Sequence, residues 1–439
     1  MGKYYVFFSI ILAFVFIRCT ERESIQYIEP DIEMSVNDSI DLSLFSPVFN
    51  KKSQLSTSSE FFGLSKGRLY VKGGSLIEQK KPYELLIDGQ KLLVTVNFWL
   101  EGKYKLEELS SSNSIRILLT KKDTTFFIEN EQLFYSIGNM HNKVFCSKLP
   151  IHDYLYTELI AENGMYAYRS GWVIYVSTDL KSWKRIYSLK RGIKSSMVFV
   201  NEKRKLLFIE YTDGKVRDKH SIYAYDFNSD KLKIKYTFSA STDALPDKES
   251  VKARHIHLIA KDPYTGDIYV GTGDTDEESM IVRSTDSGEN FTILGRGSQI
   301  WRTLSFIFTP TDIFWNTDSD KPQYLTRLSR SDIKEGLVNE EVLTRFPLIN
   351  GALWCTIDYN LSNGTKMTIM GSNNEGRIYD NYSRTYGIIF KDRKPVVYEL
   401  YKILARCPYT QLFPLGVDNE KKVYLYDVEL QKTFIYSLK

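Results

Sequence analysis

Short apolar stretches separated by polar turns run along most of the chain, and they are clearest between Arg254 and Arg302. Turn-forming Gly, Asp, Asn, Ser and Pro residues bound four such stretches there: His255–Ala260, Asp267–Thr272, Met280–Ser284 and Phe291–Leu294. Runs of this length, rich in β-branched or aromatic residues and bounded by turn residues, are typical of antiparallel strands. The segment therefore predicts one four-stranded sheet.

Similar units recur along the chain. The strand pairs that open with Met197, His255, Thr303 and Leu353 start roughly 48 to 58 residues apart, at or slightly beyond the blade period expected of β-propellers. Weaker copies bring the number of units to seven and lie within Asp123–Lys148, Thr157–Leu189 and Thr410–Tyr426. We expect the last strand, Thr433–Leu438, to pair with a strand near Ile115–Leu119 and close the ring.

Residues 31–100 differ from the repeats that follow. They contain short strand-like stretches without an internal period, which favours a small β-sandwich-like domain, and no segment shows a capped helical period. The sequence predicts an all-β protein, a seven-bladed β-propeller preceded by that small domain. The expected divisions are a signal peptide over 1–19, a linker and small β domain over 20–100, and the propeller over 101–439.

The N-terminus has the pattern of a targeting segment. Lys3 precedes the apolar run Tyr4–Ile17, which is short for a membrane span and fits the core of a signal peptide. The run leads to Cys19 and resembles a bacterial lipoprotein signal, in which that cysteine receives the lipid; Arg18 departs from the small residue usual before it. The resemblance implies a cell-envelope protein tethered to the membrane by lipid. Plain secretion is the alternative.

Charge and cysteine content exclude some classes of function. A net charge of +4 on 439 residues gives no concentrated basic stripe, so we expect no nucleic-acid partner. Three further cysteines, Cys146, Cys355 and Cys407, are too few for a disulfide framework and match no metal-binding spacing. Buried thiols are the favoured interpretation, and a pair between Cys355 and Cys407 is the alternative.

Two turns carry a recognisable motif. The segment Ser284–Phe291 reads Ser-Thr-Asp-Ser-Gly-Glu-Asn-Phe, Ser177–Trp183 is one residue shorter, and Tyr225–Asn228 is a degraded copy. They resemble the Asp-box of sialidase-like (BNR) propellers, in which the Asp bonds backbone amides of the turn. The resemblance implies structural turns at the blade periphery. The Arg-Ile-Pro motif of catalytic sialidases does not occur in the sequence, so we do not expect that activity.

His255 and His257 are the sharpest candidates for chemistry. Alternate residues of a strand face the same side, and Asp274, after the next strand, is expected at the same end of the sheet. Two histidines and a carboxylate could bind a divalent metal, or one histidine could act as a general base with Asp274 orienting it. The alternative is a buried histidine pair held by backbone groups.

Corresponding positions of other blades extend this site into a funnel. Arg302 is predicted to neutralise a substrate carboxylate, and the expected substrate-binding residues are Trp301, Asp318, Glu375, Arg384 and Tyr386. Aromatic rings and charged groups together suit a sugar. For each residue alone, an inter-blade salt bridge or a packed aromatic is an equal alternative.

The segment from His255 to Arg302 is also similar to bacterial propellers described as BNR-repeat or glycosidase-like. The resemblance implies a glycan-related role outside the cytoplasm, with polysaccharide or oligosaccharide as partner. Two hypotheses follow: a polysaccharide lyase or hydrolase, and a non-catalytic propeller that binds glycan or a protein partner.

Overall fold

A computed structural model gives the fold of the chain. It describes residues 104–149, 157–188, 196–211, 219–240, 252–318, 324–334, 336–347, 353–373, 382–404 and 410–439, together with six strands before residue 100. Residue contacts divide the chain into one unit of Met1–Gly73 with Pro82–Val96 and a second of Gly74–Lys81 with Asn97–Lys439. Cys19, Glu375 and Cys407 lie outside the described residues.

The first unit contains two three-stranded sheets. One has the order β1 (Ile32–Ser35), β6 (Gln90–Asn97), β5 (Pro82–Ile87), and the other has the order β2 (Ser39–Asp41), β4 (Arg68–Val71), β3 (Phe62–Ser65). Both sheets contribute buried apolar side chains, namely Phe62, Leu69, Leu85 and Ile87.

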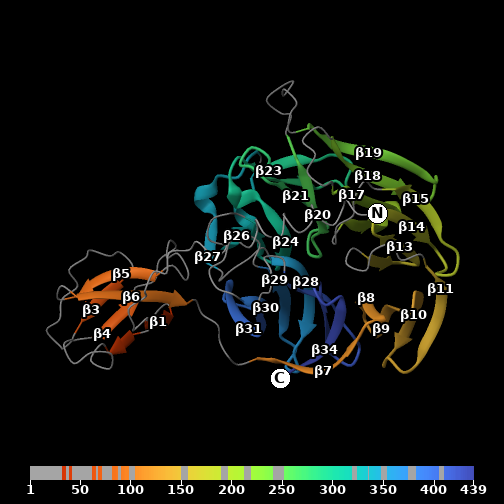
Figure 1. Cartoon of the computed structure of the whole chain (residues 1–439). Helices are drawn as coiled ribbons and strands as arrows, with labels where there is room; N and C mark the ends of the chain where they lie inside the picture. Colours follow the sequence, from red (N-terminus) through yellow and green to blue (C-terminus); the bar gives the residue numbers. More distant parts are fainter. Residues whose placement is uncertain are drawn as a thin grey trace, which may run out of the picture. The chain divides into compact units, whose positions relative to one another are not determined.

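The second unit is a seven-bladed β-propeller in which every blade is a four-stranded antiparallel sheet (Figure 1). Blades one to three consist of β8 (Ile115–Lys121), β9 (Thr124–Glu129), β10 (Gln132–Ile137), β11 (Lys143–Lys148); β12 (Glu158–Glu162), β13 (Met165–Ser170), β14 (Val173–Ser177), β15 (Lys184–Ser188); and β16 (Met197–Val200), β17 (Lys205–Ile209), β18 (His220–Asp226), β19 (Lys231–Phe238).

Blades four to seven consist of β20 (His255–Lys261), β21 (Ile268–Gly273), β22 (Met280–Ser284), β23 (Thr292–Arg296); β24 (Thr303–Phe308), β25 (Asp312–Thr317), β26 (Tyr324–Ser329), β27 (Thr344–Pro347); β28 (Leu353–Asn360), β29 (Lys366–Ser372), β30 (Tyr382–Lys391), β31 (Lys394–Leu404); and β32 (Leu412–Val417), β33 (Lys422–Asp427), β34 (Lys432–Leu438), β7 (Leu106–Ser112). Short 3₁₀ turns are η2 (Asn201–Lys203), η3 (Gln299–Trp301), η4 (Arg330–Asp332) and η5 (Glu340–Val342). The predicted all-β propeller of seven blades is confirmed.

The core lies between neighbouring blades. Second strands such as β21 and β25 are buried along their whole length, whereas β19, the outermost strand of blade three, is mostly exposed. Blades three and four meet through one apolar cluster that includes Leu207 of β17 and Ile259 of β20. Because both faces of an inner strand are covered by other blades, its sequence is a nearly continuous apolar run.

Closure of the ring differs from the sequence-based prediction. The last strand, β34, pairs with β7, so Thr433 faces Ser112 and Leu438 faces Leu106. Ile115–Leu119 instead belongs to β8, the innermost strand of blade one, so the predicted partner is wrong by one strand. The first blade also begins earlier than predicted. A β-propeller protects its sheet edges by this kind of closure.

The Asp-centred turns adopt the hydrogen bonding that their sequences indicate. Oδ1 of Asp286 accepts hydrogen bonds from the backbone N–H groups of Glu289 (3.1 Å) and Asn290 (2.9 Å). Oδ1 of Asp179 accepts equivalent bonds from Lys181 (2.8 Å) and Ser182 (2.7 Å). Each carboxylate thus replaces a missing backbone acceptor in a tight turn.

Each inner strand begins at the end of the ring where its partner, the second strand, finishes. His255 pairs with Gly273 in blade four, and Thr303 pairs with Thr317 in blade five. Residues just before an inner strand and just after a second strand therefore gather at one end of the ring. In the part of the chain that the structure describes, no helix is long and apolar enough to cross a membrane.

Candidate functional site

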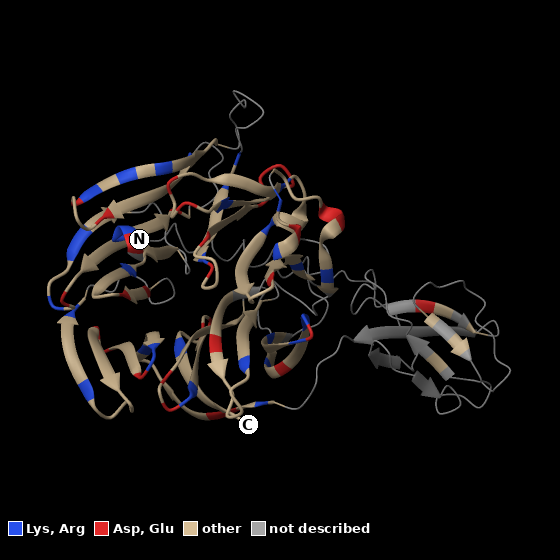
Figure 2. Ribbon diagram, turned by 180° about the vertical axis from the view of Figure 1, so that it is seen from behind, with Lys and Arg blue, Asp and Glu red and all other residues tan. Residues whose placement is uncertain are grey.

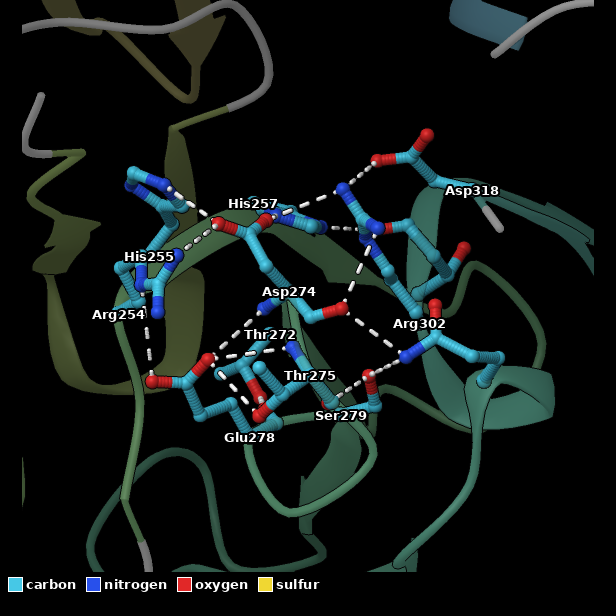
Figure 3. A network of polar contacts seen from close by, with 12 residues as sticks. Arg254, His255, His257, Thr272, Asp274, Thr275, Glu278, Ser279, Arg302 and Asp318 are labelled. Carbon is cyan, nitrogen blue, oxygen red and sulfur yellow. Dashed lines mark hydrogen bonds and ion pairs between the residues drawn. The ribbon is translucent and has the colours of Figure 1, made fainter. Parts of the chain in front are cut away.

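A polar network joins blades four and five at this end of the ring (Figure 3). His255 and His257 lie on β20, and Asp274 directly follows β21. Arg302 precedes β24, and Asp318 directly follows β25. The structure brings these five predicted site residues together.

Asp274 is the centre of the network. Its Oδ2 lies 3.0 Å from Nε2 of His255, and its Oδ1 lies 3.8 Å from Nε2 of His257. The pairing of β20 with β21 is irregular between Ile256 and Leu258. This bulge leaves His257 without a partner residue on β21, and both rings turn toward the same carboxylate.

Arg302 is shared by two carboxylates. Its Nη2 lies 3.1 Å from Oδ1 of Asp274 and 2.9 Å from Oδ2 of Asp318, and its Nη1 donates to the Asp274 carbonyl at 3.3 Å. Its side chain is largely buried. Because its guanidinium group pairs with a carboxylate of each blade, Arg302 links blades four and five. That it neutralises a substrate carboxylate stays a prediction.

Glu278 stabilises the turn that carries Asp274. Its Oε2 accepts hydrogen bonds from the backbone N–H of Thr275 at 3.1 Å and from the Thr275 hydroxyl at 3.0 Å. Nη1 of Arg254 lies 3.7 Å from Oδ2 of Asp274, and its Nε lies 3.8 Å from Oε1 of Glu278. Arg254 and Asp274 are the accessible members of the network, with side chains 32% and 25% exposed.

The protonation of two groups follows from their contacts. Burial alone would raise the pKa of Asp274, but hydrogen bonds and electrostatic attraction from His255 and His257 outweigh it and hold that pKa well below its usual range. Asp274 is therefore ionised throughout the neutral range and cannot serve as a general acid. Nδ1 of His257 lies 2.9 Å from the Thr303 carbonyl, which only accepts, so Nδ1 carries a proton.

The predicted divalent-metal site of His255, His257 and Asp274 does not fit this arrangement. Among the described residues there is no group of three or more His, Cys, Asp or Glu side chains that could hold a metal ion. The guanidinium groups of Arg254 and Arg302 lie within 3.7 Å and 3.1 Å of the Asp274 carboxylate. They already supply the positive charge that a dication would bring and would repel it.

Three predicted substrate-binding residues lie apart from this cluster. Trp301 is buried, stacks on Trp315 with ring centroids 5.5 Å apart, and donates from Nε1 to Glu340 at 2.9 Å. Tyr386 is fully buried in an apolar cluster between blades five and six. Arg384 is buried and paired with Glu399 at 2.7 Å. The structure therefore contradicts the prediction that Trp301 and Tyr386 line an open funnel, because packing covers both rings.

Two further residues, Tyr211 and Arg254, belong to the site. Tyr211 follows β17 of blade three, and its ring stacks on His255 with centroids 4.7 Å apart and an interplanar angle of 11°. The signal for Tyr211 in the sequence was its position two residues after the second strand of blade three, at the end of the ring where Asp274 lies. Arg254 directly precedes His255 in the sequence. Strand alternation does not show which way the Arg254 side chain points, because the residue lies before the strand begins.

The chain was compared with known families, curated proteins and solved structures. No known protein family matches the sequence, and no curated protein matches it significantly. Among solved structures, the extracellular domain of the proposed one-component system BT4673 from B. thetaiotaomicron is 14% identical over 76% of this chain and 40% of that chain, with a TM-score of 0.43. A prolyl endopeptidase is 8% identical over 74% and 50% of the two chains, with a TM-score of 0.42. Saccharomyces cerevisiae Sqt1 is 9% identical over 75% and 84%, with a TM-score of 0.40.

This chain spans less than half the length of the BT4673 structure. At such identities and TM-scores the likeness supplies no information about ligand or activity.

Proposed function

We propose that this protein is a glycan-binding β-propeller of the cell envelope, and that the sugar lies against Tyr211, Arg254, His255 and Asp274. The observation that carries the proposal is a flat pair of rings, Tyr211 on His255 at 4.7 Å, beside the partly exposed Arg254–Asp274 pair. The rings offer an apolar face to the C–H groups of a sugar. The guanidinium group donates to hydroxyls and the carboxylate accepts from them.

The charges of the network suit a ligand that carries hydroxyls and at most a few carboxylates. Arg254 and Arg302 face the carboxylates of Asp274, Asp318 and Glu278. The positive and negative charges nearly cancel, so the site has no strong electrostatic potential of either sign. Binding therefore depends on local hydrogen bonds. Of the two cations, Arg254 is the more exposed and is the candidate to contact a uronate carboxylate.

The test measures retention of the purified protein by immobilised uronate-containing and neutral polysaccharides. Arg254→Ala should weaken retention by roughly tenfold, the loss of one charge-assisted hydrogen bond. Arg345→Ala is a matched control, because Arg345 is similarly exposed and makes a 3.8 Å ion pair with Glu340 on the periphery of blade five. Equal retention of wild type and both variants would contradict this site, and no retention by any polysaccharide would favour a protein partner.

The contact of His255 with Asp274 favours a second candidate, β-elimination on a uronate polymer. In this reaction the His255 ring would act as the base, and its Nε2 contact with the Asp274 carboxylate would orient it. The ring would take the proton α to the uronate carboxylate while Arg254 neutralises the carboxylate. A carbon–carbon double bond forms, the glycosidic C–O bond breaks, and the departing oxygen takes a proton from water. Absorbance of unsaturated product that disappears in His255→Ala would establish this reaction, and its absence from wild type would leave binding alone.

The envelope location rests on the segment before residue 20. The apolar run and Cys19 support a lipid anchor, and the Asp179 and Asp286 turns support a relationship with the sialidase-like (BNR) propellers. Growth with a labelled fatty acid tests the anchor. Label should appear in the wild-type protein and be lost in Cys19→Ala, and an unlabelled wild-type protein would favour plain secretion.

A further inference from the structure

A groove lies between blades one and two, at the end of the ring where inner strands finish. It has a volume of 740 Å³ and reaches from the turn between β8 and β9 to the turn between β12 and β13. The His255–Asp274 network lies where inner strands begin, so the groove is separate from it. Its volume is within the range of roughly 300–1,000 Å³ that is usual for small-ligand sites.

Aromatic rings from both blades line the groove. Phe126 of β9 lies with its ring centroid 6.2 Å from that of Tyr135 of β10 and 6.2 Å from that of Tyr166 of β13. Val144 of β11, which pairs with Tyr135, adds an apolar side chain that is 46% exposed. Tyr135 and Tyr166 are partly exposed, so their rings can cover the apolar face of a bound molecule.

The charges around the groove balance. Three lysines and three carboxylates line it: Lys121, Lys122, Lys181, Asp123, Glu162 and Asp179. A charged polymer gains little from such a rim, because each attraction is offset by a repulsion of similar size. Hydroxyl groups both donate and accept, so they can bind ammonium and carboxylate groups at once.

Cys146 in the groove is not a reactive nucleophile. Burial, opposed by a backbone hydrogen bond from Tyr135, raises the pKa of the Cys146 thiol to about 11, so the thiol stays protonated near neutral pH. The Nζ of Lys121 donates to the Ala161 carbonyl at 2.9 Å and ties the two blades together across the groove. A groove that is already formed before its ligand arrives loses little entropy on binding.

We propose that this groove is a second saccharide site, which takes an uncharged oligosaccharide with its sugar rings against Tyr135 and Tyr166. The proposal is independent of the glycan site at His255 and Asp274, because no residue is shared between them. It assigns neutral sugars to blades one and two, whereas uronates would contact Arg254 on blade four.

The test is calorimetric titration of the purified protein with neutral hexasaccharides of glucose, mannose and xylose. Tyr135→Ala and Tyr166→Ala should each weaken binding by roughly tenfold, because each removes one apolar stacking face. Tyr264→Ala is the matched control, since Tyr264 is 50% exposed on blade four, outside the groove. Arg254→Ala should leave these titrations unchanged and weaken only the first site.

Val144→Arg gives an independent check, because the position is on an exposed strand edge and the long side chain would fill the groove without opening the core. It should abolish binding while thermal unfolding stays as in wild type. The proposal is overturned if no neutral hexasaccharide binds wild type. It is equally overturned if Val144→Arg binds normally, or if Tyr264→Ala weakens binding as much as Tyr166→Ala.

Discussion

Nε2 of His255 lies 3.0 Å from Oδ2 of Asp274, across the paired ends of β20 and β21. The contact joins the first residue of an inner strand to the residue after its neighbour. Asp274 also faces His257, Arg254 and Arg302. The positions of all four side chains therefore depend on the charge of one carboxylate. Any condition that neutralises Asp274 should loosen all four contacts together.

This dependence predicts how stability changes with pH. The pKa of Asp274 is lower in the folded chain than in the unfolded chain, so its contribution is fully present above the unfolded value, about 3.9. As the pH falls below that value, the unfolded state takes up the proton first, and the contribution decreases. Asp274→Asn should therefore be less stable than wild type at pH 7, and the difference should shrink between about pH 5 and pH 2.

Urea unfolding of both proteins across this range measures the difference directly. The substitution keeps the size of the side chain, so packing changes little. Asp276→Asn provides a control, because Asp276 lies in the same turn and takes part in none of the four contacts of Asp274 named above. A wild-type advantage that grows on acidification would contradict the depressed pKa.

The convergence of His255, His257 and Asp274 could be predicted because it follows from two local rules. Strand alternation predicts that the two histidines share a face, and antiparallel pairing places Asp274, at the end of one strand, beside the start of the other. The bulge at His257 was not predicted. Arg302 and Asp318 gather by the same rule in the next blade. None of these placements needs knowledge of packing between blades.

Tyr386 could not be placed from sequence because its orientation depends on packing between blades. A tyrosine in an alternating strand has the same pattern whether its ring faces the channel or a neighbouring blade, and Ile307 and Phe314 of blade five cover it. The strand that pairs with β34 and closes the ring was predicted wrongly for a related reason. The true closing strand, Leu106–Ser112, is mostly polar and exposed, so the more apolar Ile115–Leu119 was the stronger candidate.

Gly288 in the Asp286 turn is predicted to be intolerant of any side chain. Its φ is +78°, and an added Cβ would lie 2.3 Å from Cδ1 of Leu207 in the core between blades three and four. Gly266 has a φ of +80° with nothing within 4 Å. Gly266→Ala should cost about 1 kcal/mol for the backbone conformation alone, and Gly288→Ala should cost roughly 1–3 kcal/mol more for overpacking.

Chemical unfolding of the two alanine variants separates these contributions, because the backbone strain is nearly the same in both. Similar free energies of unfolding would mean that Leu207 moves aside without cost. The turn would then stabilise its own blade only, and not the junction with blade three.

Ring closure by β34 predicts a large effect at Tyr436. Its ring is 1% exposed and belongs to the cluster that joins blades six and seven. Tyr436→Ala should reduce the free energy of unfolding by roughly 3 kcal/mol or more, through lost burial and a cavity. Leu430, 46% exposed in the same blade, should tolerate alanine within about 0.5 kcal/mol.

Differential scanning calorimetry of both variants would show whether the ring unfolds as one unit. A single shifted transition for Tyr436→Ala is expected, because β7 and β34 connect the first and last parts of the propeller. A separate low-temperature transition would indicate that blade seven opens alone while the other blades remain folded.

Glu289 forms ion pairs with three lysines of blade three. Its carboxylate lies 3.1 Å from Nζ of Lys203 and 2.6 Å from Nζ of Lys205, and it also pairs with Lys235 of β19. β19 is the outermost strand of its blade and carries a row of basic residues (Figure 2). Hydrogen bonds from Lys205 and Lys235 lower the pKa of Glu289 to about 2. Glu289→Gln would remove the anion and leave three ammonium groups close together.

The substitution should lower stability by about 1 kcal/mol at low salt, since the site is partly exposed and solvent screens the charges. Added salt weakens both the attraction in wild type and the lysine repulsion in the variant, so the difference should fall toward zero near 1 M salt, where the screening length is roughly 3 Å. Thermal melts of both proteins over a salt series measure this. A difference that does not depend on salt would assign the role of Glu289 to hydrogen-bond geometry, and a variant as stable as wild type at low salt would show that the lysines disperse into solvent.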